Sequence, residues 1–306
     1  MQWRKLGLVY GPDGSQLWAK SHAMIPTPLL IKKNLLRVYC TVCDENMVGR
    51  PSYVDLNPEN PKEIIAISEK PLLDVGPPGT FDENGILTCS VVAVGSRYFM
   101  YYAGFELGTK IRYKLLTGMA ISEDGGDTFE RKQRTPILER TDKELFFRGG
   151  PFALWQEDRM RLWYASGGEW TDLNGKAMPI YDIKYQESCD GMTWQGEGTL
   201  SLAPSKSDEY AFGRPWVLQR DVNDYQLYYS IRKRSVNAYR MGYAESTNGL
   251  NWVRKDDELG LNVSREGFDS DAVMYGAVVC VNGKTYCFYN GNDFGRDGFA
   301  VAELVG

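Results

Sequence analysis

The chain has 306 residues, of which 43% are hydrophobic and 13% aromatic, and its formal net charge at pH 7 is −5. This length would suggest about two domains, although all-β rings of similar length commonly form one domain. The negative charge and the lack of a basic stripe argue against nucleic acid as a partner. The N-terminus lacks the apolar core of a signal peptide, and no run reaches the roughly 18 apolar residues of a membrane span. We therefore expect a cytoplasmic protein without membrane insertion.

Apolar segments rich in aromatic residues recur in pairs along the chain, and each pair predicts two antiparallel strands. Aromatic and β-branched residues suit such strands because they pack well on a pleated, half-buried surface. The first members of the five pairs are residues 28–31, 89–94, 151–155, 215–218 and 273–281. The second members are residues 36–40, 98–102, 161–164, 226–229 and 285–289.

A turn motif follows three of these pairs, at residues 118–129, 185–194 and 242–252. Each copy is an apolar strand, then Ser-x-(Asp/Asn)-Gly, then an aromatic residue that opens another strand. Asp-Gly and Asn-Gly between strand-like runs are strong hairpin signals. The copies recur roughly every 60 residues, a period typical of propeller blades. A truncated copy stands at Trp3-Arg4-Lys5.

These repeats predict an all-β, five-bladed β-propeller that forms a single domain over residues 1–306. The last blade runs out of chain near residue 303, so the N-terminal strand at 2–10 is expected to join it and close the ring. Closure would leave no open sheet edge between the first and last blades. The expected blades are residues 21–70, 71–135, 136–203, 204–262 and 263–306 with strand 2–10. An open sandwich with accidental hairpin similarity is the alternative.

The six cysteines predict free thiols rather than a metal site or disulfides. Cys40 and Cys43 have C-x-x-C spacing, but no second pair follows at zinc spacing and His22 is the only histidine. On a strand these two thiols point to opposite faces. Buried thiols behave as small hydrophobic groups. We expect no metal and no cofactor.

In a propeller, the segment that leads into each first strand and the loop that follows each second strand meet around the axis. Polar residues occur at both places in every predicted blade. Those in the segments that lead into first strands are His22, Asp82, Glu83, Arg148, Arg214, Asp269 and Asp271, and Tyr275 lies within the fifth first strand. Those after second strands are Asp44, Arg50, Glu106, Glu169, Arg232, Asn290 and Asn292.

Several motifs carry a family resemblance: Gly79-Thr80-Phe81-Asp82, Arg214-Pro215-Trp216, and Trp163-Tyr164 with Ser166, Gly167 and Trp170. The whole chain resembles the five-bladed propeller superfamily of arabinanases, invertases, levansucrases and mannoside phosphorylases. It is still more similar to the glycosyl hydrolase-like propellers found beside bacterial surface-polysaccharide genes. This resemblance implies two carboxylates facing each other across the axis, one protonated and one ionised.

Two of the three positions where the family places its acids lack one here. The first reads Ser21-His22-Ala23-Met24-Ile25-Pro26, and the third reads Arg148-Gly149-Gly150-Pro151. The second position retains Asp82, with Glu83 beside it, as base or transition-state stabiliser. Glu169 is expected to replace the missing acid, and His22 is a further candidate for acid–base work.

Four arginines, Arg50, Arg148, Arg214 and Arg232, are expected at the axis. Their guanidinium groups would repel one another unless acids or an anionic ligand lay among them. Arginine is a preferred bidentate partner for carboxylate and phosphate. An acidic sugar, sugar phosphate or nucleotide-sugar would fit this arrangement. The alternative is that these arginines pair with nearby carboxylates and hold the blades together.

The sequence therefore favours a carbohydrate-active enzyme that acts on an activated or acidic sugar in bacterial surface-polysaccharide metabolism. Two alternatives remain, a non-catalytic sugar or nucleotide-sugar binding propeller and an ordinary glycoside hydrolase with relocated acids. The Ser122–Phe129 turn also fits sialidases, but those have six blades and an arginine before the Ile-Pro of Met24-Ile25-Pro26. The expected partner is a small-molecule sugar, and the sequence predicts no oligomeric state.

Overall fold

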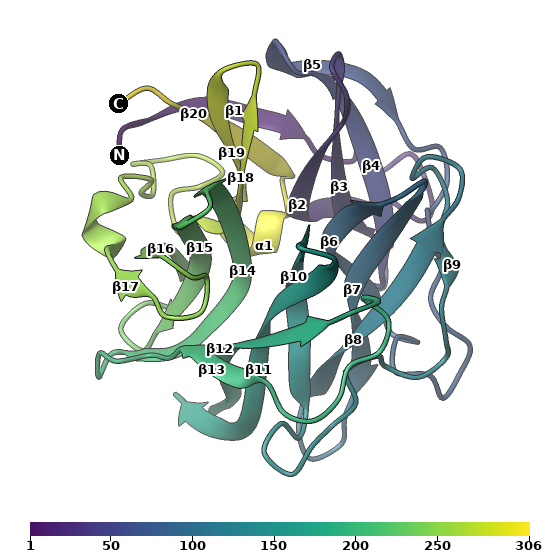
Figure 1. The fold of residues 1–306 in the computed structure, drawn as a ribbon, viewed down its shortest axis with the longest axis vertical. Helices are drawn as coiled ribbons and strands as arrows, with labels where there is room; N and C mark the ends of the chain where they lie inside the picture. Colours follow the sequence, from purple (N-terminus) through teal and green to yellow (C-terminus); the bar gives the residue numbers. More distant parts are fainter.

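The computed structural model describes all 306 residues, and β-strands dominate it (Figure 1). The strands are β1 (Trp3–Tyr10), β2 (Ser21–Lys32), β3 (Leu35–Cys43), β4 (Gly49–Asn57), β5 (Asn60–Ile67), β6 (Ile86–Val94), β7 (Arg97–Leu107), β8 (Tyr113–Ser122), β9 (Glu130–Arg131), β10 (Phe147–Gln156), β11 (Arg159–Leu173), β12 (Lys176–Ser188), β13 (Thr199–Leu202), β14 (Glu209–Asp221), β15 (Asp224–Lys233), β16 (Tyr239–Ser246), β17 (Val253–Arg254), β18 (Met274–Val281), β19 (Lys284–Asn290) and β20 (Phe299–Leu304). The helices are η1 (Asp256–Glu258) and α1 (Asn292–Gly295). Neither is long or apolar enough to cross a membrane. The predicted all-β class is confirmed.

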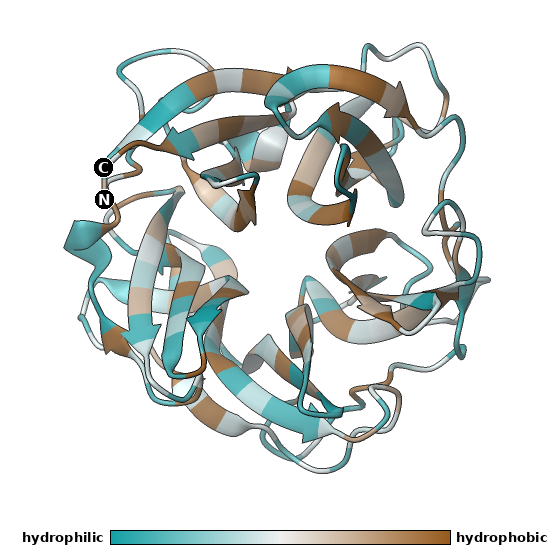
Figure 2. Cartoon of the chain, turned by 45° about the horizontal axis from the view of Figure 1, so that its top comes forward, coloured by the Kyte–Doolittle hydropathy of each residue, from teal (hydrophilic) through white to brown (hydrophobic).

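Antiparallel pairing divides the strands into five groups of four: β2–β5, β6–β9, β10–β13, β14–β17, and β18–β20 with β1. The first strands of neighbouring groups lie against one another. Short parallel bridges, Phe147 to Leu115 and Tyr181 to Ala211, link three of the groups. Figure 2 shows the groups arranged around a central axis.

The N-terminal strand β1 pairs with β20, the last strand of the chain, from Trp3 opposite Leu304 to Tyr10 opposite Phe299. The amide of Gln2 also donates to the carbonyl of Gly306, so the two ends of the chain lie side by side (Figure 1). The fifth group is therefore built from both ends of the sequence.

Four of the first strands, β2, β6, β10 and β14, begin earlier than the sequence predicts, and three of them continue through similar bulges. The pairing register shifts between Met24 and Thr27, between Gly149 and Phe152, and between Gly213 and Trp216. Each bulge contains a proline, which cannot donate to the ladder and is tolerated at such irregularities. The preceding residues Ile25, Gly150 and Arg214 all have positive φ. His22, Arg148 and Arg214 consequently lie within strands, and the expectation that they belong to segments leading into the strands was wrong.

The turn after each Ser-x-(Asp/Asn)-Gly motif is longer than a two-residue hairpin. β8 ends at Ser122 and its partner β9 begins only at Glu130. Side chains hold the turn instead: Ser122 Oγ accepts from the amide of Gly126 at 2.9 Å, and Asp124 Oδ1 accepts from that of Thr128 at 3.0 Å. Ser188 with Asp190 and Ser246 with Asn248 make matching contacts. The motif therefore has a structural role.

These turns also fasten neighbouring groups together through one repeated hydrogen bond. Tyr101 Oη donates to the carbonyl of Gly191 in the next group at 2.7 Å. Trp163 Nε1 donates to that of Gly249 at 2.7 Å, and Tyr39 Oη to that of Gly126 at 3.3 Å. We call these three bonds the inter-group latches. A Cβ on Gly191 would lie 2.7 Å from Tyr101 Oη, so close approach requires glycine there.

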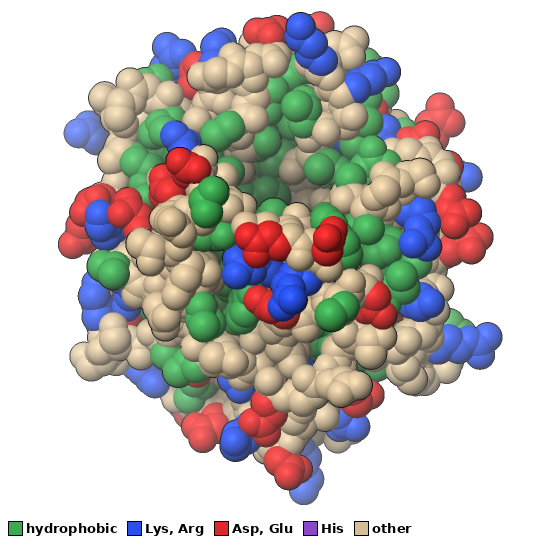
Figure 3. Space-filling model, viewed as in Figure 1, with side chains coloured by type: hydrophobic (Ala, Val, Ile, Leu, Met, Phe, Trp, Pro, Cys, Tyr) green, Lys and Arg blue, Asp and Glu red, His purple; other side chains and the backbone are tan.

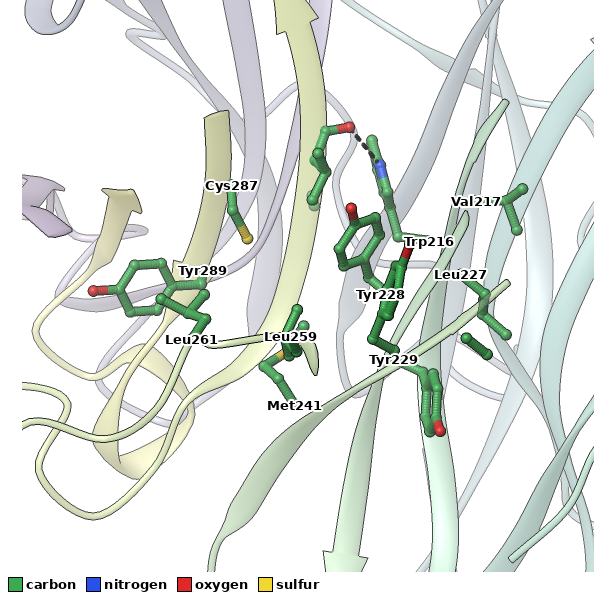
Figure 4. Close-up of a cluster of buried hydrophobic side chains, with 14 of the residues drawn as sticks. Trp216, Val217, Leu227, Tyr228, Tyr229, Met241, Leu259, Leu261, Cys287 and Tyr289 are labelled. Carbon is green, nitrogen blue, oxygen red and sulfur yellow. Dashed lines mark hydrogen bonds between the residues drawn. The ribbon is translucent and has the colours of Figure 1, made fainter. Parts of the chain in front are cut away.

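Aromatic side chains fill the space between groups. The largest cluster joins the last three groups and contains Trp216, Tyr228, Tyr229 and Tyr289 (Figure 4). Trp216 Nε1 donates to the carbonyl of Val278 at 2.8 Å across this cluster. A buried indole or phenol thus contributes apolar area and satisfies its polar atom at the same time.

All six cysteines are free, as predicted. Cys40, Cys43, Cys89 and Cys287 are buried, whereas Cys189 and Cys280 are exposed. The expectation of burial is therefore confirmed for four of them and was wrong for the other two. No group of three or more His, Cys, Asp and Glu side chains is arranged to hold a metal ion.

The latches yield a stability prediction. Tyr101→Phe should lower the free energy of unfolding by about 1 to 2 kcal/mol, because the carbonyl of Gly191 loses its buried donor. Urea denaturation measures this change. Tyr98→Phe is the matched control, since the Tyr98 hydroxyl makes no hydrogen bond, and it should change stability by less than about 0.5 kcal/mol. Equal effects of both substitutions would contradict the latch.

The turn aspartates predict a pH dependence. Partial burial opposes ionisation, but hydrogen bonds from Thr128, Ser122 and the backbone outweigh it and lower the pKa of Asp124 to about 2. Similar bonds lower the pKa of Asp190 to about 2. Unfolded aspartate has a pKa near 3.9, so this stabilisation is complete above about pH 5 and is lost as the pH falls through about 2.

The double variant Asp124→Asn/Asp190→Asn removes the titration and keeps an acceptor oxygen, as Asn248 does in the third turn. Between pH 5 and pH 2.5 the melting temperature of the wild type should fall more steeply than that of the variant. If the melting temperatures of the wild type and the variant fall equally over this pH range, the two aspartates are not the source of the pH dependence.

Candidate functional site

A cavity of about 1230 Å³ opens at the axis and receives residues from all five groups. Contributors from the five first strands include Met24, Leu87, Phe147, Tyr210 and Met274. Of the 34 residues that line the cavity, 21 are hydrophobic. The walls are therefore much more apolar than the sequence analysis expected. Residues from the β11–β12 hairpin, Lys176 and Met178, also line the cavity.

Aromatic rings form a continuous belt along the cavity. We call this set the aromatic belt; it consists of Phe105, Tyr113, Phe147, Tyr181, Tyr239, Tyr275 and Phe294. Phe147 stacks on Tyr181 with ring centroids 4.7 Å apart and planes within 2°. Tyr239 lies 5.5 Å from Tyr275. Stacked and tilted rings can accept the apolar face of a sugar or of another ring.

Arg232 extends from the end of β15 into this belt. Its Nε donates to Tyr239 Oη at 2.6 Å and to Tyr181 Oη at 3.1 Å, and its guanidinium lies 4.3 Å from the centroid of the Tyr239 ring. The two hydroxyl oxygens are 2.7 Å apart. The sequence folds this way because β15 and β16 pair Arg232 directly with Tyr239.

Arg232 lines the cavity and has no carboxylate partner within the protein. None of the other three predicted arginines combines these two properties. Arg50 pairs with Asp44 at 2.9 Å and with Asp74 at 2.7 Å. Arg148 lies 3.4 Å from Glu144. For these two residues the alternative interpretation, internal pairing, agrees with the contacts.

Arg214 also lacks an acidic partner, but it lies beneath the cavity rather than in its wall. Its side chain is 3% exposed and donates to the carbonyl of Pro26 at 3.2 Å and to Thr27 Oγ1 at 3.0 Å. Burial lowers the pKa of Arg214 to about 10, so the guanidinium is still charged at pH 7. We assign it a structural role between β14 and β2.

Protonation makes the cluster around Arg232 a set of hydrogen-bond donors. Burial raises the pKa of Tyr181 well above its usual value, so this phenol stays protonated. Only one of the hydroxyls of Tyr181 and Tyr239 can donate to the other. The two Nη atoms of Arg232 make a single long contact, 3.5 Å to Tyr210 Oη. Most of these donors are therefore available to a ligand.

The structure does not bring the four predicted catalytic residues together in the cavity wall. Asp82 is fully buried, where its Oδ2 accepts from Arg131 at 2.8 Å and from Tyr102 at 3.0 Å. Glu83 accepts from the amide of Gly79 at 2.6 Å. Glu169 is exposed.

The remaining predicted catalytic residue, His22, is buried, and its Nδ1 lies 2.8 Å from Ser21 Oγ. Burial lowers the pKa of His22, so its imidazole is neutral at pH 7. Like the three carboxylates, it does not line the cavity.

The predicted binding residues divide into two sets. Arg232, Asp271, Tyr275 and Asn292 line the cavity. The others make internal contacts: Asp44 with Arg50, Glu106 with Lys114 at 2.6 Å, Asp269 with Lys5 at 2.6 Å, and Asn290 with the amide of Ile25 at 2.7 Å. The axis therefore gathers fewer polar groups than the sequence predicted, because most of them pair with nearby loops and strands.

Carboxylates are scarce in the wall. Asp271 and Asp293 are the acidic residues that line the cavity, and both come from the last group. The cationic residues Arg112, Lys176, Arg232 and Arg240 outnumber them. Over the face of the molecule shown in Figure 3, by contrast, acidic and basic side chains are interspersed. The cavity is thus suited to an anion more than to chemistry by two opposed carboxylates.

Sequence reasoning missed most of the aromatic belt. Tyr181 and Tyr239 each stand seven residues before the serine of a turn motif, whereas Tyr113 stands nine residues before one. Tyr181 and Tyr239 therefore occupy equivalent positions of the third strands β12 and β16. Alignment of the turn motifs could have found these two tyrosines, whereas a search restricted to charged residues could not.

Comparison with known proteins identifies a relative over the whole chain. The chain is 31% identical over 304 residues to the uncharacterized protein Rv1502 of Mycobacterium tuberculosis, and the match covers 99% of each protein. The chain belongs to the Rv1502 family. No model of a wider protein family matches the sequence.

Solved structures show the fold of the Rv1502 family chain. A glycoside hydrolase superposes with a TM-score of 0.73 at 18% identity, covering 99% of this chain and 91% of the other. The α-L-arabinofuranosidase of Lactobacillus brevis superposes with a TM-score of 0.71 at 11% identity, covering 95% and 92%. The chain therefore has the fold of the propeller glycoside hydrolases, as the resemblance implied. At these identities the similarity shows the fold alone.

The buried contacts of Asp82 yield a prediction. Asp82→Ala should lower the free energy of unfolding by about 3 to 5 kcal/mol, because it leaves Arg131 without its buried partner. Thermal and urea unfolding measure the change. Glu83→Ala, at a partly exposed neighbour, should cost about 1 kcal/mol or less. An unchanged melting temperature of Asp82→Ala would restore the catalytic interpretation of this residue.

Proposed function

We propose that the chain binds an activated or acidic sugar in the central cavity, with the anionic group of the ligand on Arg232. The observation that carries this proposal is a charged guanidinium in an aromatic wall, without any carboxylate partner, whose Nη donors are almost unused. A buried charge is costly unless it is paired. A carboxylate or phosphate would supply the missing partner through bidentate hydrogen bonds.

The aromatic belt supports a sugar as the rest of the ligand. Phe147, Tyr181 and Tyr275 offer ring faces, while Lys176 offers an ammonium group in the same cavity. The cavity volume of about 1230 Å³ exceeds the usual range for small-molecule sites, about 300 to 1,000 Å³. A sugar phosphate, a uronic acid or a nucleotide-sugar would fit in it.

As part of the same proposal, the five antiparallel groups are five propeller blades of a single domain, and β1 closes the ring. The pairing of β1 with β20 supports closure. The resemblance to propellers beside surface-polysaccharide genes supports a role in the metabolism of such polymers. Arg50, Arg148 and Arg214 are not included in the proposed ligand site.

The scarcity of carboxylates favours the non-catalytic alternative over hydrolysis with relocated acids. Two-carboxylate hydrolysis needs an acid and a base on either side of the bond. Asp271 and Asp293 both come from the last group, and Asp293 is 74% exposed. Binding is therefore the activity that the cavity supports best.

Calorimetric titration with D-glucose 1-phosphate, D-glucuronate and UDP-glucose tests the proposal. At least one anion should bind more tightly than neutral methyl glucoside. Arg232→Met should weaken that binding by tenfold or more, because it removes the guanidinium and keeps an apolar stem.

Arg234→Met is the matched control, since it removes the same charge from an exposed residue outside the cavity wall, and it should leave the affinity unchanged. Absence of Arg232-dependent binding for all three anions would refute the proposal. NMR spectra of the same mixtures separate binding from turnover, because a chemical change of the sugar would favour the enzymatic alternative.

A further inference from the structure

One part of the cavity wall is aliphatic. Met24 and Ile25 of β2, Leu87 of β6 and Leu115 of β8 line the cavity and pack together in one cluster. We call these four residues the aliphatic wall. Cys43 lies in the same cavity, and burial raises the pKa of its thiol to about 12, so it remains neutral.

The aliphatic side chains offer no hydrogen bonds to a ligand, and the backbone amide of Ile25 beside them is already used inside the protein. The amide of Ile25 donates to Asn290 Oδ1 at 2.7 Å. Asn290 Nδ2 donates to the carbonyl of Ala23 at 2.8 Å and to that of Gly298 at 2.9 Å. All polar atoms of Asn290 are therefore used inside the protein. A sugar hydroxyl pressed against this wall would lose water and gain no partner, which disfavours binding.

The aliphatic wall lies close to the proposed anion site. The Tyr275 ring packs against the aliphatic cluster, and its centroid is 5.5 Å from that of Tyr239. Tyr239 also contacts the Arg232 guanidinium, which lies 4.3 Å from the ring centroid. Two tyrosine rings, those of Tyr275 and Tyr239, thus lie between the two features, and a ligand that contacts both would span these rings with a sugar unit and its anionic group.

We infer that the ligand is an anionic sugar with an apolar substituent, a deoxy, O-methyl or O-acyl group, on the edge that faces the aliphatic wall. This inference rests on the proposed function and adds the class of sugar. Arg232 selects the charge, and the wall selects a methyl or acyl group over a hydroxyl. A methyl group buries apolar area there without stranding a polar atom.

Matched sugar phosphates test the inference by calorimetric titration of the wild-type chain. The probes are D-glucose 1-phosphate and its 6-deoxy, 3-O-methyl and 6-O-acetyl derivatives. At least one derivative should bind about tenfold or more tightly than the parent compound, because an unpartnered hydroxyl is replaced by an apolar group.

Leu87→Asn adds a donor and an acceptor to the wall and should reduce this preference severalfold, and Leu115→Gln provides a second variant at another strand. Leu200→Asn is the control, because Leu200 is exposed on β13 and does not line the cavity. It should keep the wild-type preference.

The outcomes separate the two proposals. If the parent compound binds in an Arg232-dependent way and no derivative binds more tightly, the inferred substituent is wrong and the proposed function stands. If none of these probes, and neither D-glucuronate nor UDP-glucose, shows Arg232-dependent binding, both are wrong. A preference that persists unchanged in Leu87→Asn and Leu115→Gln would also overturn the assignment to this wall.

Discussion

The inter-group latches are the interaction on which the arrangement of the strands depends. Each joins an aromatic side chain on a second strand to a glycine carbonyl in the turn of the next group, as Tyr101 does with Gly191. The glycine is required because a side chain would collide with the aromatic partner. These turns do not line the cavity, so this part of the fastening between groups is separate from the cavity wall.

This separation explains how the axis holds an unpaired charge. Arg232 is kept in place by stacking on Tyr239 and by phenol oxygens, rather than by a carboxylate that would neutralise it. These neutral phenols accept some of the hydrogen bonds of Arg232 but do not neutralise its positive charge, which can then pair with an anionic ligand. In the proposed ligand site, the aliphatic wall would limit which edge of the ligand faces it. The charged residue Arg232 lies in the fourth strand group, whereas the aliphatic wall is built from the first two groups. A substitution can therefore change one of these features without changing the other.

The sequence predicted the fold class well because its signals are local and repeated. The apolar pairs and the Ser-x-(Asp/Asn)-Gly motif report on strands and turns directly. The site was harder to predict, because the state of a charged residue depends on a partner far away in the chain. Asp82 is neutralised by Arg131 and Arg50 by Asp74, and neither pairing is visible in the local pattern. Arg232 was expected at the axis and lines the cavity, whereas its partners Tyr181 and Tyr239 were not among the predicted residues.

The pairing of Trp3 with Leu304 has a consequence for the order of folding. The first strand leaves the ribosome almost three hundred residues before its partner exists, and it must wait in an unpaired state. Contacts between such distant segments slow folding, because a long loop must close before they form. The fifth group, which needs both ends of the chain, is therefore expected to assemble last.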